Sequence, residues 1–223
     1  MPITNFDLVM FDCDGVLVDS EPIINRAHAE VLSECGYQIT PDTLIERFCG
    51  ISDAEMLGII ESEWGRRLPA DYEAQIAEVV DAHSEKALAA FPGIHEVLDR
   101  LDLPTCVVSS GTLRRIRKSL GIVGLLDRFE PHIFSAEMVT RGKPAPDLFL
   151  YSALQMGVDA SRCLVIEDST AGVQGAVSAN MAVIGFCGGG HCSPVHRQIL
   201  SRYGASAVIS HFEELLPRIE VLN

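Results

Sequence analysis

Two carboxylates stand two positions apart near the start of the chain, where an apolar run ends. Asp12 and Asp14 follow the run 7–11, and Gly15 comes directly after them. Burying carboxylates at the end of a strand costs free energy unless a cation neutralises them. Mg²⁺ prefers oxygen ligands, so it could bind the Asp12 side chain and the Asp14 backbone carbonyl and leave the Asp14 carboxyl free to move a proton. The alternative is an Asp-Gly turn without a ligand.

A second acidic pair, Glu167 and Asp168, follows the apolar run 163–166. Burial of these carboxylates also costs free energy unless a cation neutralises them, so we expect them to supply the remaining ligands of the metal. Small residues follow the pair, which lets the next helix pack closely on the sheet.

Two further segments carry groups that suit an anion. Ser109 ends the apolar run 105–109, and Ser110 and Gly111 follow it. Hydroxyls and free amides at this point can bind a phosphate. The alternative is an ordinary helix N-cap. Lys143 lies in a loop that two prolines stiffen. A lysine held beside carboxylates would neutralise charge and hold a phosphate oxygen, whereas the alternative is a lysine on the surface.

The elements that position these residues follow from the apolar runs. Such short, nearly continuous runs are typical of buried parallel strands, and helical periodicity separates them from about residue 100 onward. We therefore predict an α/β core with a doubly wound, Rossmann-like parallel sheet. The predicted strands are 7–11, 105–109, 132–135, 163–166, 182–186 and 207–209.

Residues 20–87 interrupt this alternation, with helical stripes and almost no strand signal. Residues 19–90 also hold fifteen acidic and five basic side chains, so most of the chain's net charge of −14 lies there. This indicates a separate helical cap domain, 19–87, inserted into a core domain formed by 1–18 and 88–223.

Together, and in this order along the chain, the motifs resemble the haloacid dehalogenase superfamily. The similarity is to the branch with a helical cap after the first motif, which includes β-phosphoglucomutase-like phosphatases. The resemblance implies a role for each matching residue: Asp12 as nucleophile and metal ligand, Asp14 as general acid/base with its carbonyl on the metal, Ser109 as phosphate-binding hydroxyl, Lys143 as the cation beside nucleophile and phosphate, Asp168 as distal metal ligand, and Glu167 as a metal ligand or a partner of one.

The resemblance implies Mg²⁺-dependent hydrolysis of a small phosphomonoester, a sugar phosphate or sugar-acid phosphate, through an aspartyl phosphate on Asp12. The alternatives are a phosphomutase and a non-catalytic binding module on the same fold. A dehalogenase would need neither Asp14 nor a metal. Ile24 and Cys49 stand where the sugar mutases carry histidine and lysine, which favours hydrolysis over phosphoryl return.

Three features have two interpretations each. Arg47, in the cap loop 46–52, either binds the substrate's leaving group or faces water between helices. The basic cluster Arg114–Lys118 either attracts an acidic substrate or is a solvated helix face. The loop Cys187–Cys192 with His191 contains zinc-ligand types, but its spacing fits no common structural site and favours a loop near the mouth of the active site.

Composition excludes several classes of partner. A net charge of −14 is unfavourable for binding nucleic acid or an anionic membrane surface, and no apolar run reaches the roughly 18 residues of a membrane span. An odd number of cysteines and the absence of a basic, signal-like N-terminus favour reduced thiols in the cytoplasm. We expect a monomer or weak homo-oligomer.

Overall fold

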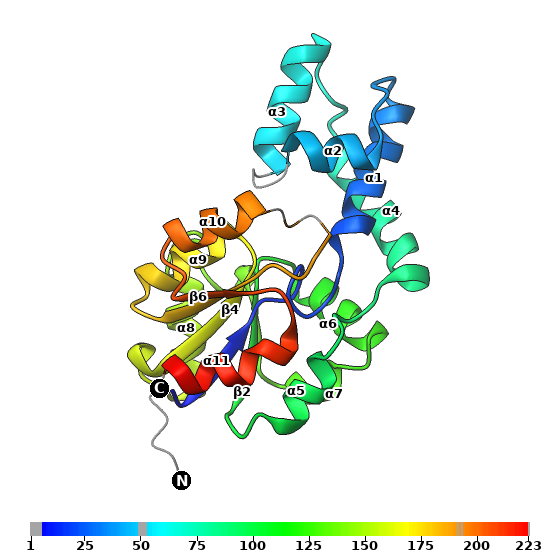
Figure 1. Ribbon diagram of the computed structural model, residues 1–223. Helices are drawn as coiled ribbons and strands as arrows, with labels where there is room; N and C mark the ends of the chain where they lie inside the picture. The colour runs from blue at the N-terminus through cyan, green and yellow to red at the C-terminus, as the bar shows by residue number, and fades with distance from the viewer. Residues whose placement is uncertain (1–5, 49–52, 191, 193, 223) are drawn as a thin grey trace. The chain divides into compact units, whose positions relative to one another are not determined.

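The computed structural model describes residues 6–48, 53–190, 192 and 194–222 (Figure 1). The chain forms two compact units: Met1–Asp19 with Ala89–Asn223, and Ser20–Leu88. Across the described residues, no helix is both long and apolar enough to cross a lipid bilayer.

The first unit contains a six-stranded parallel sheet in the order β3-β2-β1-β4-β5-β6. The predicted doubly wound fold is therefore confirmed, and each predicted strand is present within one residue at its ends. The strands are β1 (Leu8–Phe11), β2 (Thr105–Ser109), β3 (Ile133–Ser135), β4 (Cys163–Glu167), β5 (Ala182–Phe186) and β6 (Ala207–Ile209).

The chain order of the strands reverses at β1. Phe11 aligns with Val107 of β2 on one side and with Ile166 of β4 on the other. In open α/β sheets, ligands bind beyond the carboxyl ends of the strands at such a switch point. The residues that follow β1, β2 and β4 therefore meet where this fold usually holds its ligand.

Helices cover both faces of the sheet because side chains alternate along each strand. Leu8 and Met10 lie in an apolar core with residues of α8 (Asp147–Met156), α9 (Thr170–Ser178) and α10 (Pro194–Arg202). On the opposite face Phe11 contacts Phe129 edge-on. The remaining helices of this unit are α5 (Ile94–Arg100), α6 (Leu113–Ile122), α7 (Leu126–Phe129) and α11 (Leu215–Leu222), with the 3₁₀ turns η1 (Ala136–Met138), η2 (Ala160–Arg162) and η3 (Phe212–Glu214).

The second unit is helical throughout its described residues and has a core of its own. Its helices are α1 (Glu21–Glu34), α2 (Pro41–Phe48), α3 (Asp53–Trp64) and α4 (Tyr72–Ala87). The apolar stripes seen in the sequence form this core: Val31 and Leu32 of α1 pack with Met56 and Ile60 of α3. His28 and the Tyr72 hydroxyl form a buried hydrogen bond of 2.9 Å between α1 and α4.

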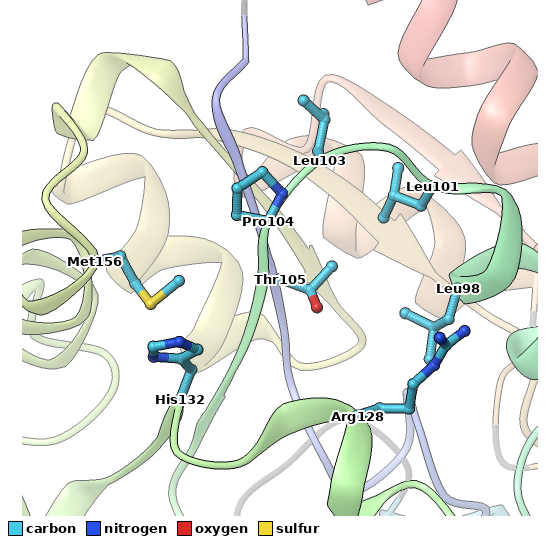
Figure 2. A pocket seen from close by; sticks show the side chains of 8 residues that line it. All are labelled: Leu98, Leu101, Leu103, Pro104, Thr105, Arg128, His132 and Met156. Carbon is cyan, nitrogen blue, oxygen red and sulfur yellow. The ribbon is translucent and has the colours of Figure 1, made fainter.

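A cavity of about 370 Å³ lies at the amino ends of the strands (Figure 2). Thr105 begins β2 and His132 immediately precedes β3, so this cavity is at the edge of the sheet opposite Asp12. Leucines line much of it, and its one arginine, Arg128, is ion-paired with Asp99. The cavity therefore takes no part in the chemistry described next.

Candidate active site

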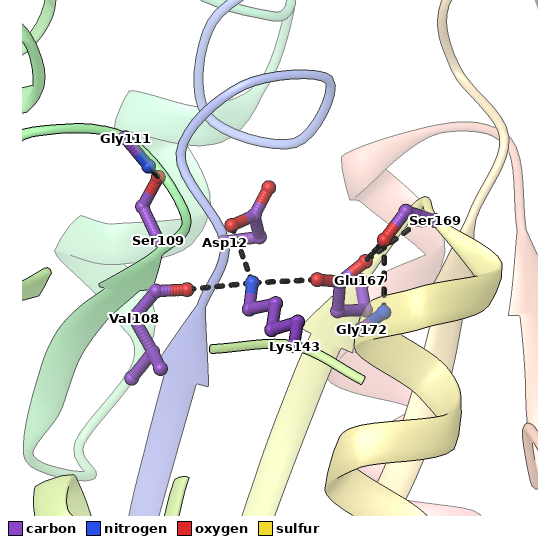
Figure 3. Close-up of polar contacts among 8 residues, drawn as sticks. All are labelled: Asp12, Val108, Ser109, Gly111, Lys143, Glu167, Ser169 and Gly172. Atoms are coloured by element: carbon purple, nitrogen blue, oxygen red, sulfur yellow. Dashed lines mark hydrogen bonds and ion pairs between the residues drawn. The ribbon is translucent and has the colours of Figure 1, made fainter. Parts of the chain in front are cut away.

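Lys143 connects three segments of the core at the carboxyl edge of the sheet (Figure 3). Its ammonium donates to Asp12 Oδ1 at 2.7 Å, to Glu167 Oε1 at 2.7 Å and to the Val108 carbonyl at 2.8 Å. These acceptors belong to the ends of β1, β4 and β2. Only 3% of the Lys143 side chain is exposed, so these contacts replace its hydration. The predicted neighbours Asp12, Lys143 and Glu167 are thus brought together, although Asp12 and Lys143 are 131 residues apart in the chain.

The charges around Lys143 do not balance. Asp12, Glu167 and Asp168 are all buried, and one carboxylate oxygen of each lies within 4.8 Å of the others. Burial raises the pKa of Asp12 well above its usual value; Lys143 opposes this rise, and the charges of Glu167 and Asp168 add to it. For Lys143, burial acts to lower the pKa, but Asp12 and Glu167 outweigh it and raise the pKa.

Three carboxylates around one ammonium leave an excess of buried negative charge. A divalent cation would remove this excess and keep Asp12 ionised. The donor set consists of oxygens, which is what Mg²⁺ requires. The residues present therefore fit a magnesium ion.

Two glycines allow the carboxylates to approach the backbone. At Gly15, where φ is +79°, a Cβ atom would lie 1.9 Å from Asp168 Oδ2. At Gly172, in the first turn of α9, a Cβ atom would lie 1.7 Å from Glu167 Oε1. Any side chain at either position would displace an acidic group of the site.

Glu167 is fixed from its other side by Ser169. The Ser169 amide and hydroxyl donate to Glu167 Oε2 at 2.7 and 2.9 Å. The same hydroxyl accepts from the Gly172 amide at 2.9 Å and so caps α9. Ser169 was not among the predicted site residues, although a capping serine directly after the acidic pair was visible in the sequence.

Hydrogen bonds of two serines organise the loop after β2, where the predicted phosphate-binding residues lie. Ser109 Oγ accepts from the Gly111 amide at 3.2 Å, and Ser135 Oγ donates to the Gly111 carbonyl at 2.6 Å. The cap of α6 is Thr112, whose hydroxyl accepts from the Arg115 amide at 3.3 Å. Because Thr112 is the N-cap of α6, neither Ser109 nor Ser110 has that role. Ser109 is buried, and Ser110 is exposed.

Asp14 contacts an arginine that the sequence left ambiguous. Arg115 Nη2 lies 3.3 Å from Asp14 Oδ1, with 24% of the Asp14 side chain exposed and 35% of the Arg115 side chain. Within the cluster Arg114–Lys118, Arg115 therefore has a carboxylate partner, and the attraction of an acidic substrate by the cluster stays a prediction. Thr112 starts α6 directly after the loop, so the first helical turn places Arg115 beside Asp14.

The chain is similar to known proteins in sequence and in fold. Residues 9–186 match the sequence model of the haloacid dehalogenase-like hydrolases. It is also 33% identical, over 198 residues, to the 6-phosphogluconate phosphatase of Escherichia coli, an alignment covering 86% of this chain and 88% of that protein. The chain belongs to the haloacid dehalogenase-like hydrolase family. The predicted family is confirmed.

Solved structures of this family agree with the fold. A haloacid dehalogenase-like protein of unknown function from Agrobacterium tumefaciens is 40% identical, with a TM-score of 0.89 and coverage of 97% of this chain and 99% of that one. A hydrolase of the family from Deinococcus radiodurans, solved with bound phosphate and sodium, is 31% identical, with a TM-score of 0.80 and coverage of 95% and 94%.

The remaining candidate site residues of this hydrolase do not belong to the cluster around Lys143. Arg47 lies in the helical unit, where its Nη2 is 2.7 Å from both carboxylate oxygens of Glu63 and its Nη1 is 3.4 Å from the Tyr37 hydroxyl. Its role in substrate binding stays a prediction. Cys49 and His191 lie outside the described residues.

Proposed function

We propose that this hydrolase cleaves small phosphomonoesters, sugar phosphates or sugar-acid phosphates, through an aspartyl phosphate on Asp12. The observation that carries the proposal is the buried contact of Lys143 with Asp12 and Glu167, beside Asp168. The class, phosphoric monoester hydrolase, is that of the E. coli 6-phosphogluconate phosphatase to which the chain is similar.

In the first step, an Asp12 carboxylate oxygen attacks phosphorus in line with the ester bond. The bond to the leaving oxygen breaks, and Asp14 gives that oxygen its proton. In the second step, the ionised Asp14 takes a proton from water, whose oxygen attacks phosphorus, so inorganic phosphate leaves and Asp12 is restored. Lys143 offsets the charge of Asp12 in both steps, and we assign Ser109, Ser110 and Gly111 to the binding of the other phosphate oxygens.

We assign the magnesium ligands to the Asp12 and Asp168 carboxylates and the Asp14 backbone carbonyl. When bound, Mg²⁺ would screen the repulsion between the Asp12 carboxylate and the anionic phosphate. Glu167 contacts Lys143 and Ser169, which supports a role in positioning Lys143, with direct ligation as the alternative. The relative from D. radiodurans was solved with bound phosphate and sodium, which supports binding of a phosphate group and of a cation by this family.

Removal of the metal is expected to abolish phosphate release. Treatment with EDTA should reduce the rate to background, and Mg²⁺ in excess of the chelator should restore it, because Asp12 needs the cation to stay ionised. Chelator already saturated with Mg²⁺ is the control and should have no effect. Full activity in EDTA alone would exclude a required metal.

Arg115 offers a means of selecting the substrate. A cation beside the general acid can bind a second anionic group, such as the carboxylate of a phosphorylated sugar acid. We expect Arg115→Ala to raise KM for 6-phosphogluconate about 10-fold or more. The effect on glucitol 6-phosphate, which carries an alcohol in place of the carboxylate, should be small.

Arg117→Ala is the matched control for this variant. It removes the same charge from the same helix, but its side chain pairs with Glu130 at 2.6 Å, not with Asp14. The measurement is the ratio of KM for the two substrates. Equal changes for both substrates in Arg115→Ala would contradict a role in recognising the carboxylate.

Hydrolysis and mutase activity share the chemistry of Asp12 and Asp14, so a direct assay must separate them. The enzyme is incubated with β-glucose 1-phosphate and a trace of the 1,6-bisphosphate, and glucose 6-phosphate and inorganic phosphate are followed together. We expect inorganic phosphate to dominate. Efficient formation of glucose 6-phosphate with little free phosphate would overturn the proposal.

We further propose that residues 19–87 act as the cap domain of this family. The enzyme is expected to work in the cytoplasm as a monomer or weak homo-oligomer. The six cysteines in the described part of the chain are free thiols, as a reducing compartment would keep them.

A further inference from the structure

A second group of metal-ligand types shares no residue with the carboxylate cluster and adjoins it at Asp168. Cys187 and Cys192 approach His196, and one potential ligand atom of each lies within 4.8 Å of the others. The sequence presented the two cysteines with His191, at a spacing that fits no common structural site, and His191 lies outside the described residues. The structure supplies a further ligand from α10, four positions after Cys192.

Main-chain hydrogen bonds hold the two cysteines in place. Cys187 directly follows β5, and its amide donates to the Ile209 carbonyl at the end of β6 at 2.8 Å. The Cys192 amide donates to the Gly189 carbonyl at 3.0 Å. The two thiols also interact with each other: this contact, followed by burial, raises the pKa of Cys192.

His196 is oriented as histidine ligands of metals usually are. Its side chain is buried, and Nε2 lies 2.6 Å from the Asp168 backbone carbonyl. Because a carbonyl can only accept, Nε2 must carry the proton, and in the neutral ring Nδ1 is then the acceptor. A carbonyl that fixes the tautomer in this way is the usual support of a ligating histidine.

We propose that Cys187, Cys192 and His196 form a binding site for a soft divalent metal ion of the Zn²⁺ class. Two thiolates and one imidazole are ligands that zinc prefers and magnesium does not. The two thiols lose their protons to solvent as the Zn–S bonds form, and water completes the tetrahedral set. The ion would join the end of β5 to the first turn of α10.

The site is tested on the reduced, metal-stripped protein by titration with Co²⁺ in excess Mg²⁺. Coordination by thiolate gives a near-ultraviolet charge-transfer band, which carboxylate ligands cannot give, so Co²⁺ bound at Asp12 and Asp168 stays silent. We expect the band to saturate at one equivalent. The charge-transfer band does not depend on catalysis, so its absence would contradict the metal site without contradicting the phosphatase assignment.

Three variants and a control locate the ligands. Cys187→Ser, Cys192→Ser and His196→Gln should each weaken Zn²⁺ binding at least about 100-fold in competition with a chromophoric chelator. Cys35→Ser removes a half-buried thiol from α1's C-terminal cap and should leave the affinity unchanged. Circular dichroism checks that each variant is folded. If the buried His196→Gln variant does not fold, the two cysteine variants still decide the test, because Cys187 and Cys192 are only partly buried.

Zn²⁺ should also protect Cys187 and Cys192, but not Cys35, from alkylation, which mass spectrometry of the peptides can follow. Absence of the charge-transfer band in the wild-type protein would overturn the proposal. So would a band that survives in both cysteine variants, or alkylation of these two thiols at the same rate with and without Zn²⁺.

Discussion

Replacement of Asp12 by asparagine is expected to lower kcat at least about 10³-fold. The amide cannot attack phosphorus, and it also withdraws one charged ligand from the cation. The fold should persist, since Lys143 keeps its contacts with Glu167 and the Val108 carbonyl and the carboxylate cluster loses repulsion. Steady-state phosphate release and thermal unfolding measure the two effects.

The matched control is Asp7→Asn. Asp7 immediately precedes β1, whereas Asp12 follows it, so the two residues lie at opposite ends of the strand. The exposed Asp7 carboxylate pairs with Arg162. The control should retain nearly normal kcat. A tenth or more of normal activity in Asp12→Asn would exclude Asp12 as the nucleophile.

Loss of the Lys143 charge should damage both activity and stability. In Lys143→Met, Asp12 and Glu167 stay buried without their shared ammonium, which should cost about 3–5 kcal/mol of unfolding free energy. We expect kcat to fall about 10²–10³-fold, because no fixed cation then faces the attacking oxygen. Mg²⁺ should recover part of the stability by supplying positive charge to the same cluster.

Lys86→Met, at an exposed position of α4, removes the same charge elsewhere and should change neither quantity. Urea unfolding with and without Mg²⁺ provides the comparison. If Lys143→Met unfolded like the wild-type protein and retained its rate, Lys143 would be neither the structural nor the electrostatic centre of the site.

Much of the core was predictable because its physics is local. Runs such as 163–166 are apolar throughout, and the strand they predict is buried along its whole length. The order of the strands makes the acidic residues after β1 and β4 neighbours, so two sequence motifs predict one cluster.

Other parts of the site depend on where side chains point in the folded protein, which the spacing of residues in the sequence does not predict. Among the basic residues of α6, Arg115 pairs with Asp14, whereas Arg117 pairs with Glu130. Ser169 caps a helix and holds Glu167 with the same hydroxyl. His196 carries no motif in the sequence, and only the fold brings it beside the Asp168 carbonyl.

The central position of β1 has a consequence for synthesis of the protein. β1 leaves the ribosome first, yet the neighbour that completes its pairing, β4, follows Arg162, which is 155 positions after Asp7. At about 5–20 residues per second, the apolar segment Leu8–Phe11 waits on the order of ten seconds or more for that partner. The nascent chain therefore exposes an aggregation-prone strand throughout translation of the helical insert, and we expect its yield to depend on chaperones that shield this segment.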